Sequence, residues 1–383
     1  MRALHKVLVF PAWRDNPYLN LLSLAPRAAG FEFSGVTVYE SLVQSVGRLE
    51  SGDVLHVHWT TPILQRRRTD ADAWAGLAEF TSILDDLRGR GVRIIWTVHN
   101  RLPHELAHRE PEIALHRLLA ERSDVIHVMA PATPQVLAEV CELPADRVRT
   151  IAHPSYLGVY GAPPARGAAR AGLGLGADER TVLFLGQMRP YKGLGTLLSA
   201  MRVLAERGDP VPTLLLAGSA TAEAQAEITA ALPTEVKAVT RFEFVPDAEV
   251  GTWFAAADLA VFPYTSILNS GSLHLSAAFD VPVLLPGEPH LVEQFGDEPW
   301  VGFFDLADPV ESMATAITDA LATSAEVDLT RRFDRFNAER SPWRISSDYA
   351  DLLVELTTAN RHESPQSVHR ATAGAPGSPL HPV

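Results

Sequence analysis

Strand-like and helix-like segments alternate along almost the whole of this 383-residue chain. Such alternation predicts parallel β-sheets with helices on both faces, an α/β fold. The clearest helical spacing covers residues 73–87, and Gly89 and Gly91 end it. In the first half the expected strands are Val7–Phe10, Gly35–Tyr39, Val54–His58, Arg93–Val98, Val125–Met129 and Val148–Ile151. In the second half they are Thr181–Leu185, Thr213–Ala217, Val239–Val245, Leu259–Pro263 and Val281–Leu285.

A segment rich in proline and glycine interrupts the alternation near the middle of the chain. It predicts a linker at 166–178 between two Rossmann-like domains, 1–165 and 179–340, which face each other across a cleft. The glycine run 172–176 precedes a strand, whereas a dinucleotide-binding loop follows one, so it does not predict a cofactor site. The final helix, 341–359, is expected to pack back toward the first domain. The tail, 360–383, has the composition of a disordered segment.

The net charge, the cysteine content and the apolar runs of the chain limit its expected partners and location. The formal net charge of −13 argues against nucleic acid, because phosphate backbones select basic surfaces. The basic run Arg66–Arg68 is most simply a solvated loop. Cys141 is the single cysteine, so no intrachain disulfide can form, and packing is its expected role. Neither a signal peptide nor a membrane-spanning run is evident. We therefore expect a cytoplasmic protein, with peripheral contact at the inner face of the membrane left open.

Two loops in the second half have the features of anion sites. Arg189 and Lys192 follow the strand at 181–185 and precede a helix that starts after Gly193, and helix N-termini attract anions. The second loop is Ser270–Ser272, where the serine at 270 fits a helix N-cap. Two anion loops on a parallel scaffold indicate a diphosphate leaving group and hence nucleotide-sugar chemistry. The expected donor-binding residues are Gly186, Arg189, Lys192, Glu243, Tyr264, Ser270, Gly271 and Ser272.

These motifs resemble those of GT-B-fold glycosyltransferases that use nucleoside-diphosphate sugars. The resemblance is carried by Gly186…Arg189-Pro190-Tyr191-Lys192-Gly193, Ala257-Asp258-Leu259 and Pro263-Tyr264…Ser270-Gly271-Ser272…Val281-Pro282-Val283. It implies that Arg189 and Lys192 neutralise the donor diphosphate. The large retaining group usually has two glutamates, spaced eight residues apart, in the loop and helix before the Val281-Pro282-Val283 strand. Ile267 and Leu275 occupy those positions here.

Motifs of the first half resemble a narrower group, the bacterial β-mannosyltransferases that build lipid-linked exopolysaccharide units. They are Asn16-Pro17-Tyr18, His56-Val57-His58-Trp59, Thr97-Val98-His99-Asn100…Pro103-His104-Glu105 and His153-Pro154…Tyr156. This resemblance implies an inverting reaction, with mannose from GDP-mannose as one donor. The acceptor would be a glycan, a lipid-linked sugar or a secondary metabolite.

An inverting transfer needs a general base from the first domain, across the cleft. The candidates are Asp15, His58, His99, His104 and Glu105, of which His99 and Glu105 are the predicted catalytic residues. The predicted acceptor-binding residues are Asn16, Tyr18, His58, Trp59 and Asn100. Either His56 or His58 is expected to serve packing alone, because they alternate along one strand.

No metal or other cofactor is expected. Asp70 and Asp72 precede a helix and fit its capping turn better than a metal site. Arg189 and Lys192 already supply positive charge for the diphosphate. Two other functions stay open at this point: a nucleotide-sugar epimerase, which needs no acceptor, and a non-catalytic nucleotide-sugar-binding module.

Overall fold

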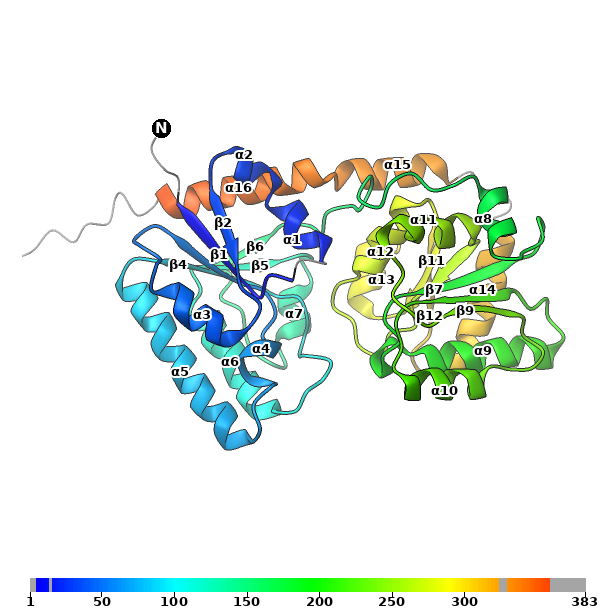
Figure 1. Ribbon diagram of the computed structural model, residues 1–383, viewed down its shortest axis with the longest axis horizontal. Coiled ribbons are helices and arrows are strands. Elements are labelled where there is room, and N and C mark those ends of the chain that lie inside the picture. Colours follow the sequence, from blue (N-terminus) through cyan, green and yellow to red (C-terminus); the bar gives the residue numbers. More distant parts are fainter. Residues whose placement is uncertain (1–4, 14–15, 324–328, 359–383) are drawn as a thin grey trace, which may run out of the picture.

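Two lobes, each built on a parallel β-sheet, form the computed structural model, which describes residues 5–13, 16–323 and 329–358 (Figure 1). Helices cover both faces of each sheet. The expected α/β architecture of two Rossmann-like domains is confirmed. Among the described helices, none is long and apolar enough to cross a membrane.

The strands of the amino-terminal sheet have the order β2-β1-β3-β4-β5-β6, and all neighbouring pairs are parallel. Their bounds are β1 (Lys6–Phe10), β2 (Glu32–Gly35), β3 (Val54–Val57), β4 (Arg93–Thr97), β5 (Val125–Val128) and β6 (Val148–Thr150). The helices are α1 (Pro17–Leu22), α2 (Leu24–Ala28), α3 (Tyr39–Val46), α4 (Thr61–Leu64), α5 (Asp70–Gly89), α6 (Arg109–Arg122) and α7 (Thr133–Leu137). The strand order reverses between β1 and β3, and ligands of open parallel sheets bind beside such a reversal.

The carboxyl-terminal sheet has the order β12-β11-β10-β7-β8-β9, again parallel throughout. Its strands are β7 (Thr181–Leu185), β8 (Thr213–Ala217), β9 (Ala238–Arg241), β10 (Leu259–Val261), β11 (Val283–Pro286) and β12 (Val301–Phe304). The helices are α8 (Arg166–Gly172), α9 (Leu194–Arg207), α10 (Ala222–Ala231), α11 (Asp247–Ala256), α12 (Gly271–Ala278), α13 (Pro289–Phe295), α14 (Pro309–Thr323) and α15 (Thr330–Glu339), with a 3₁₀ turn η1 (Pro190–Lys192). Here the order reverses between β7 and β10.

Each sheet separates two hydrophobic cores. In β1, Leu8 and Phe10 pack into a core shared with α5 and α6, whereas Val7 and Val9 pack into the core on the opposite face. Because both faces are covered, the strands form nearly continuous apolar runs, and this is why the sequence revealed them.

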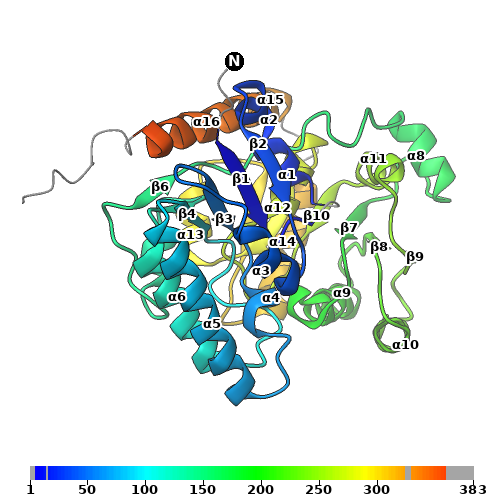
Figure 2. The ribbon, with the colours of Figure 1, turned by 60° about the vertical axis from the view of Figure 1, so that its left-hand side comes forward.

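The terminal helix α16 (Pro342–Thr358) lies on the amino-terminal domain, beside α1 and α2 (Figures 1 and 2). Ile345, Tyr349 and Leu353 are buried in the core that contains Val7. The Tyr349 hydroxyl lies 2.7 Å from Nδ1 of His56. The chain therefore completes the second domain and then returns to the first.

Three strands at the edges of the sheets differ from those expected. β2 lies before most of the predicted strand Gly35–Tyr39, because α3 begins at Tyr39. β9 ends at Arg241 rather than at Val245, and β12 was not predicted. Edge strands have one neighbour and keep exposed side chains, so they lack the continuous apolar run that marks a central strand.

The structure also differs from the linker expected at 166–178. This segment carries α8, which packs against α11 of the carboxyl-terminal domain, and Ala169 and Leu175 are buried in that domain's core. The alanines of α8 favour a helix, and proline lies only before it. The chain crosses between the two sheets within residues 151–165.

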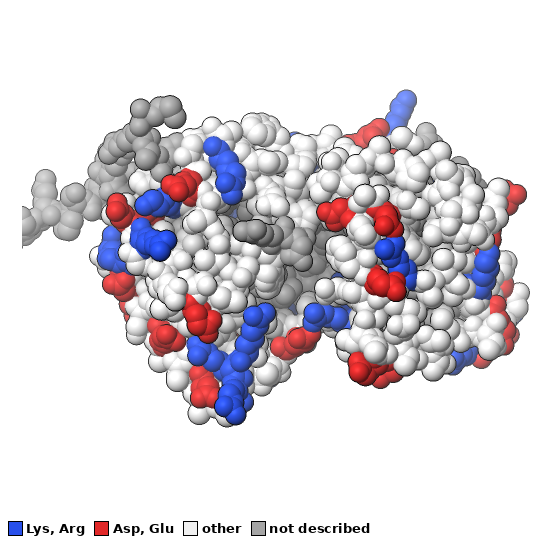
Figure 3. All heavy atoms as spheres, viewed as in Figure 1, with Lys and Arg blue, Asp and Glu red and all other residues white. Residues whose placement is uncertain are grey.

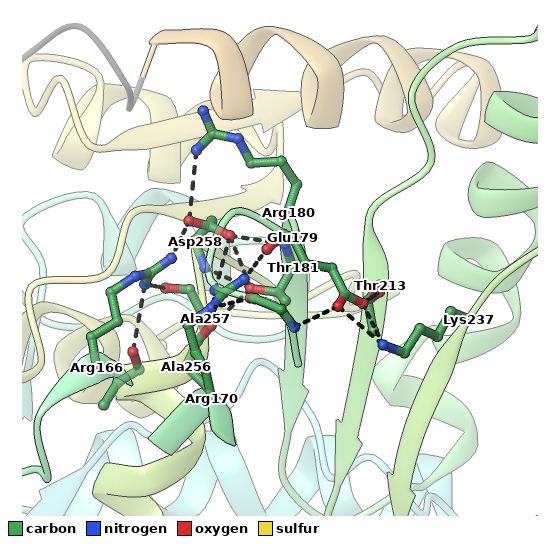
Figure 4. A network of polar contacts seen from close by, with 12 residues as sticks. Arg166, Arg170, Glu179, Arg180, Thr181, Thr213, Lys237, Ala256, Ala257 and Asp258 are labelled. Atoms are coloured by element: carbon green, nitrogen blue, oxygen red, sulfur yellow. Dashed lines mark hydrogen bonds and ion pairs between the residues drawn. The ribbon is translucent and has the colours of Figure 1, made fainter. Parts of the chain in front are cut away.

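A buried carboxylate holds α8 to the sheet (Figure 4). Asp258, just before β10, accepts a hydrogen bond of 2.8 Å from the backbone N–H of Thr181 and pairs with Arg166 at 2.6 Å. The guanidinium of Arg170, which is almost fully buried, lies 3.7 Å from the same carboxylate and donates to the carbonyl oxygen of Ala256 at 2.9 Å. The network joins α8, β7 and the start of β10.

Several histidines of the amino-terminal domain are buried in neutral surroundings. The Thr97 hydroxyl lies 2.7 Å from Nε2 of His56 and 3.0 Å from Nδ1 of His127. Burial lowers the pKa of His127 to about 4, and burial likewise lowers the pKa of His153 to about 4. Both imidazoles are therefore neutral at pH 7.

The free energy of unfolding is expected to fall as the pH drops from 6.5 toward 4. In that window the unfolded chain protonates these histidines, whose ordinary pKa is 6.5, while the folded chain does not. Each such histidine contributes about 1.4 kcal/mol per pH unit. Urea unfolding of the full chain between pH 7.5 and pH 5 measures the slope, and His127→Gln should reduce it. A free energy of unfolding that is constant over this range would contradict the neutral, buried state.

Candidate functional site

The loop between β7 and α9 forms the first part of the site. Arg189 precedes the 3₁₀ turn η1, Lys192 ends that turn, and Gly193 takes a left-handed conformation with φ of 69°. The helix predicted to follow is confirmed, since α9 begins at Leu194. The loop leaves the carboxyl end of β7, beside the point where the strand order of the second sheet reverses.

Gly193→Ala is expected to lower the free energy of unfolding by about 2 kcal/mol or more. An added Cβ would lie 1.8 Å from the carbonyl oxygen of Pro263, and the positive φ disfavours any side chain. Urea unfolding measures the loss. Gly195→Ala is the matched control, because open space surrounds that position in α9 and alanine favours a helix. Equal stability of the two variants would contradict this account of the loop.

Lys192 belongs to a short polar chain across the second domain. Its Nζ donates to the hydroxyl of Tyr264 at 3.1 Å, and that hydroxyl lies 2.7 Å from Oγ of Ser272. The ammonium also lies 4.2 Å from the centroid of the Tyr264 ring. In the part of the chain that the structure describes, no carboxylate pairs with Lys192. Its charge is available to an anion.

The loop between β10 and α12 forms the second part of the site and bridges the domains. The predicted N-cap is confirmed, because Oγ of Ser270 accepts a hydrogen bond of 3.1 Å from the backbone N–H of Leu273. Nδ2 of Asn269 donates to the carbonyl oxygen of His99 in the first domain at 3.2 Å. Leu268 packs into a core of the first domain.

A cavity of about 740 Å³ separates the two domains, and Figure 3 shows the molecule hollowed between its lobes. This volume lies within the range of small-molecule sites. Its carboxyl-terminal wall consists of Gln187, Arg189, Tyr191, Lys192, Tyr264, Ser266, Ile267, Leu268, Asn269, Ser270, Gly271, Ser272 and Leu275. The remaining lining residues are Trp13, Asn16, Pro17, Trp59, Arg66, Asn100, His104, Tyr156 and Tyr160.

Two further contacts between described residues join the domains at this cavity. Arg189 forms an ion pair with Glu105, although 45% and 73% of their side chains are exposed, so the pair contributes little to stability and can be exchanged for another anion. The ring of His104 stacks on Tyr191, with 3.7 Å between the centroids and 2° between the planes. Residues of the first domain therefore lie directly against the Arg189–Lys192 loop.

His99 pairs with His58 behind the cavity wall. Nδ1 of His58 lies 2.9 Å from Nε2 of His99, and burial lowers the pKa of both rings, so two neutral imidazoles share one hydrogen bond. The Trp59 ring, which lines the cavity, stacks on His99 with 4.0 Å between centroids. Trp59 thus stands between His99 and the cavity.

The structure brings together most of the predicted binding residues. Those that line the cavity are Asn16, Trp59, Asn100, Arg189, Lys192, Tyr264, Ser270, Gly271 and Ser272. Those that do not are Tyr18, Gly186, His58, His99, Glu105 and Glu243. Glu243 was expected at the end of a strand, but β9 ends two residues earlier and Glu243 lies in the exposed loop that follows. Asp15 lies outside the described residues.

Sequence reasoning missed part of the cavity wall. Trp13 lines the cavity, and its ring centroid lies 4.6 Å from that of Trp59. Arg66 also lines the cavity, although the basic run to which it belongs predicts a solvated loop. Trp13 follows the carboxyl end of β1, so its strand-end position was the usable signal, whereas Arg66 follows helix α4 and gave no such signal. Ile267 and Leu275 also line the cavity, where the resemblance to retaining enzymes would have placed acids.

The second domain carries the signature of a known enzyme family. The family described as group 1 glycosyl transferases matches residues 179–323. GDP-mannose:glycolipid 4-beta-D-mannosyltransferase of Xanthomonas campestris pv. campestris is 28% identical over 308 residues, which cover 78% of this chain and 79% of that protein. Sucrose-phosphate synthase of Thermosynechococcus elongatus superposes with a TM-score of 0.71 at 18% identity, over 93% of this chain and 100% of the other. The chain is a glycosyltransferase of the GT-B fold.

A second solved structure agrees with the glycosyltransferase fold. Anabaena HepE in complex with UDP superposes with a TM-score of 0.66 at 14% identity, over 92% of this chain and 100% of the other. At such identities the superpositions establish the fold alone. In this GT-B glycosyltransferase, the cavity with Lys192 and Arg189 lies between the two domains, at the strand-order reversals of both sheets.

Proposed function

We propose that this glycosyltransferase moves a hexose from a nucleoside-diphosphate sugar to a hydroxyl of a glycan, lipid-linked sugar or secondary-metabolite acceptor, with inversion and without a metal ion. Mannose from GDP-mannose is the first donor to test. The observation that carries the proposal is the position of Lys192 and Arg189, opposite an aromatic and amide wall of the first domain in one cavity.

The relatives support this choice of donor. The Xanthomonas protein is named for transfer from GDP-mannose to a glycolipid with a β-linked product. Transfer from an α-linked nucleotide sugar to a β-linked product inverts the anomeric carbon. HepE, which shares the fold, binds UDP in its solved structure. A nucleoside diphosphate is therefore the ligand class to expect in the cavity.

The second domain is arranged to stabilise the leaving diphosphate. Lys192 provides a point charge and Arg189 a planar fork that can bind two phosphate oxygens. The N-terminus of α12, at Gly271 and Ser272, adds free backbone N–H groups. Such preformed positive groups matter most as charge develops on the leaving group. They make a divalent cation unnecessary for charge balance.

The first domain would hold the acceptor. Trp13 and Trp59 line the cavity, and sugar rings pack well on aromatic side chains. The amides of Asn16 and Asn100 lie on the same wall and can bind sugar hydroxyls. Closure of the cavity around both substrates would exclude water and limit hydrolysis of the donor.

We propose His99 and Glu105 as proton acceptors for the attacking hydroxyl, each after one rearrangement. Trp59 must move aside to uncover His99, whereas Arg189 must leave Glu105 for the donor diphosphate. His99→Asn and Glu105→Gln, assayed at saturating donor, separate the two. Loss of the base should lower kcat at least about tenfold. The donor Kd should stay unchanged in His99→Asn, whereas Glu105→Gln releases Arg189 and should not weaken donor binding. If a variant keeps the full kcat, the residue that was replaced is not the general base.

Calorimetric titration with GDP, UDP, ADP and NAD, in the presence of a chelator, tests the proposal. Binding of one nucleoside diphosphate without metal supports the donor site and identifies the nucleotide of the donor. Preference for NAD, or no diphosphate binding, would overturn it. Product analysis with the matching nucleotide sugar then separates the alternatives. An epimerase converts the sugar without an acceptor, and a binding module leaves it unchanged with every acceptor.

A further inference from the structure

Among the described residues that line the main cavity, His104 differs from the others in its acid–base chemistry. It is the one side chain in that wall that can change its charge near neutral pH, since the others are tyrosines, permanent cations or uncharged groups. It comes from the first domain, yet it lies against the diphosphate-binding loop of the second domain.

The groups around His104 come from both domains. Tyr191 covers one face of the imidazole, and Nζ of Lys192 lies 5.2 Å from the centroid of the Tyr191 ring on the same turn. Arg189 is paired with Glu105, the neighbour of His104 in sequence. Two cations and one carboxylate thus surround the imidazole.

These surroundings keep the imidazole uncharged in the free protein. Burial lowers the pKa of His104, and the charges of Lys192 and Arg189 lower it further, while Glu105 acts in the opposite direction. At pH 7 the ring is neutral and can accept a proton when the balance of charge changes.

We propose that His104 takes up a proton when a donor diphosphate occupies the Arg189–Lys192 loop, and that the resulting cation binds the diphosphate from the first domain. This inference rests on the proposed function. It assigns to His104 a role in donor binding and in holding the two domains together around the donor.

The electrostatics support the proposal in three steps. A bound diphosphate brings negative charge close to the stacked ring, which favours the imidazolium. It neutralises Lys192 and Arg189, the two cations that disfavour protonation. It also draws Arg189 from Glu105, and the freed carboxylate then favours the cation. All three changes raise the proton affinity of His104 in the complex relative to the free protein.

Proton uptake fixes the sign of the pH dependence. A ligand that raises the proton affinity of a group binds more tightly as the pH falls, by up to about tenfold per pH unit between the free and bound pKa values. The donor Kd should therefore rise as the pH increases from 6.5 to 8.5. GDP-mannose is a suitable probe, because its bridged diphosphate has no ionisation of its own near neutral pH. UDP-glucose replaces it if UDP is the nucleotide that binds.

Titration calorimetry in buffers of different ionisation enthalpy measures the protons taken up. For the unmodified protein we expect a net uptake and a Kd at least about tenfold weaker at pH 8.5 than at pH 6.5. His104→Asn should abolish both effects and match the unmodified protein at pH 8.5. His104→Arg, which keeps a planar cation on Tyr191, should bind tightly at both pH values. His5→Asn, outside the cavity, is the control histidine and should behave as the unmodified protein.

The outcomes distinguish this inference from the proposed function. Binding that is independent of pH and takes up no proton would overturn the role of His104 and leave the donor site intact. Uptake that persists in His104→Asn would assign the proton to another group and would also overturn it. Failure of every nucleotide sugar to bind the unmodified protein would instead overturn the proposed function, and the role of His104 with it.

Discussion

Lys192→Ala is expected to weaken binding of the nucleoside diphosphate by about 1.5–3 kcal/mol, roughly 10- to 150-fold in Kd. The kcat/KM for transfer should fall about 100- to 1,000-fold, because the ammonium stabilises charge that develops on the leaving group. Lys192 lines the cavity and has no carboxylate partner among the described residues, so its charge serves a ligand more than the fold. Calorimetry and initial rates measure the two effects.

The fold should tolerate this substitution. Within the chain, the ammonium of Lys192 contacts the hydroxyl and ring of Tyr264 and the ring of Tyr191. Loss of these contacts should change the free energy of unfolding by about 1 kcal/mol or less. Lys237→Ala is the control, because that lysine lies outside the cavity and pairs with Glu179. Its nucleotide affinity should equal that of the unmodified protein. If Lys192→Ala lost stability and affinity in equal measure, the loop would be structural and the donor site would lie elsewhere.

Asp258→Ala is expected to lower the free energy of unfolding by about 3–5 kcal/mol, because it leaves a buried arginine without its carboxylate. Asp258 is 9% exposed at its side chain, and the Arg170 guanidinium beside it is 3% exposed. The backbone N–H of Thr181 also loses its acceptor at the start of β7. Urea unfolding followed by circular dichroism measures the loss of stability.

Arg180→Ala is the matched control for this network (Figure 4). Arg180 lies 3.7 Å from the same carboxylate, but its side chain is 48% exposed, so removing it should cost less than about 1 kcal/mol. Comparable losses in the two variants would show that the network is an ordinary surface cluster. The expected difference would instead show that α8 depends on Asp258 and belongs to the carboxyl-terminal domain.

The elements of the candidate site that are local in sequence were predictable. Ser270 caps α12 because its side chain reaches the N–H of Leu273, three residues away, and Gly193 precedes a helix because only glycine suits its conformation and space. The central strands were predictable for a similar reason, since burial on both faces requires continuous apolar runs. The bounds of edge strands such as β2 were not predicted correctly, because exposed positions need no continuous apolar run.

Pairings between the domains were not predictable from any local pattern. Arg189 and Glu105 are 84 residues apart, and nothing in either segment indicates that they meet. The stacking of His104 on Tyr191 likewise depends on how the first domain packs against the second. His99 was predicted to face the cleft because it follows a strand, but Trp59 from the neighbouring strand end covers it.

The sequence by itself determined the two-domain α/β fold and the position of Arg189 and Lys192 in a loop between a strand and a helix, because strand burial and helix starts depend on neighbouring residues. Only the tertiary structure decided which first-domain residues reach that loop. His104 does and His99 does not, because side-chain access to the cavity depends on the packing of distant segments such as those of Trp59 and Tyr191.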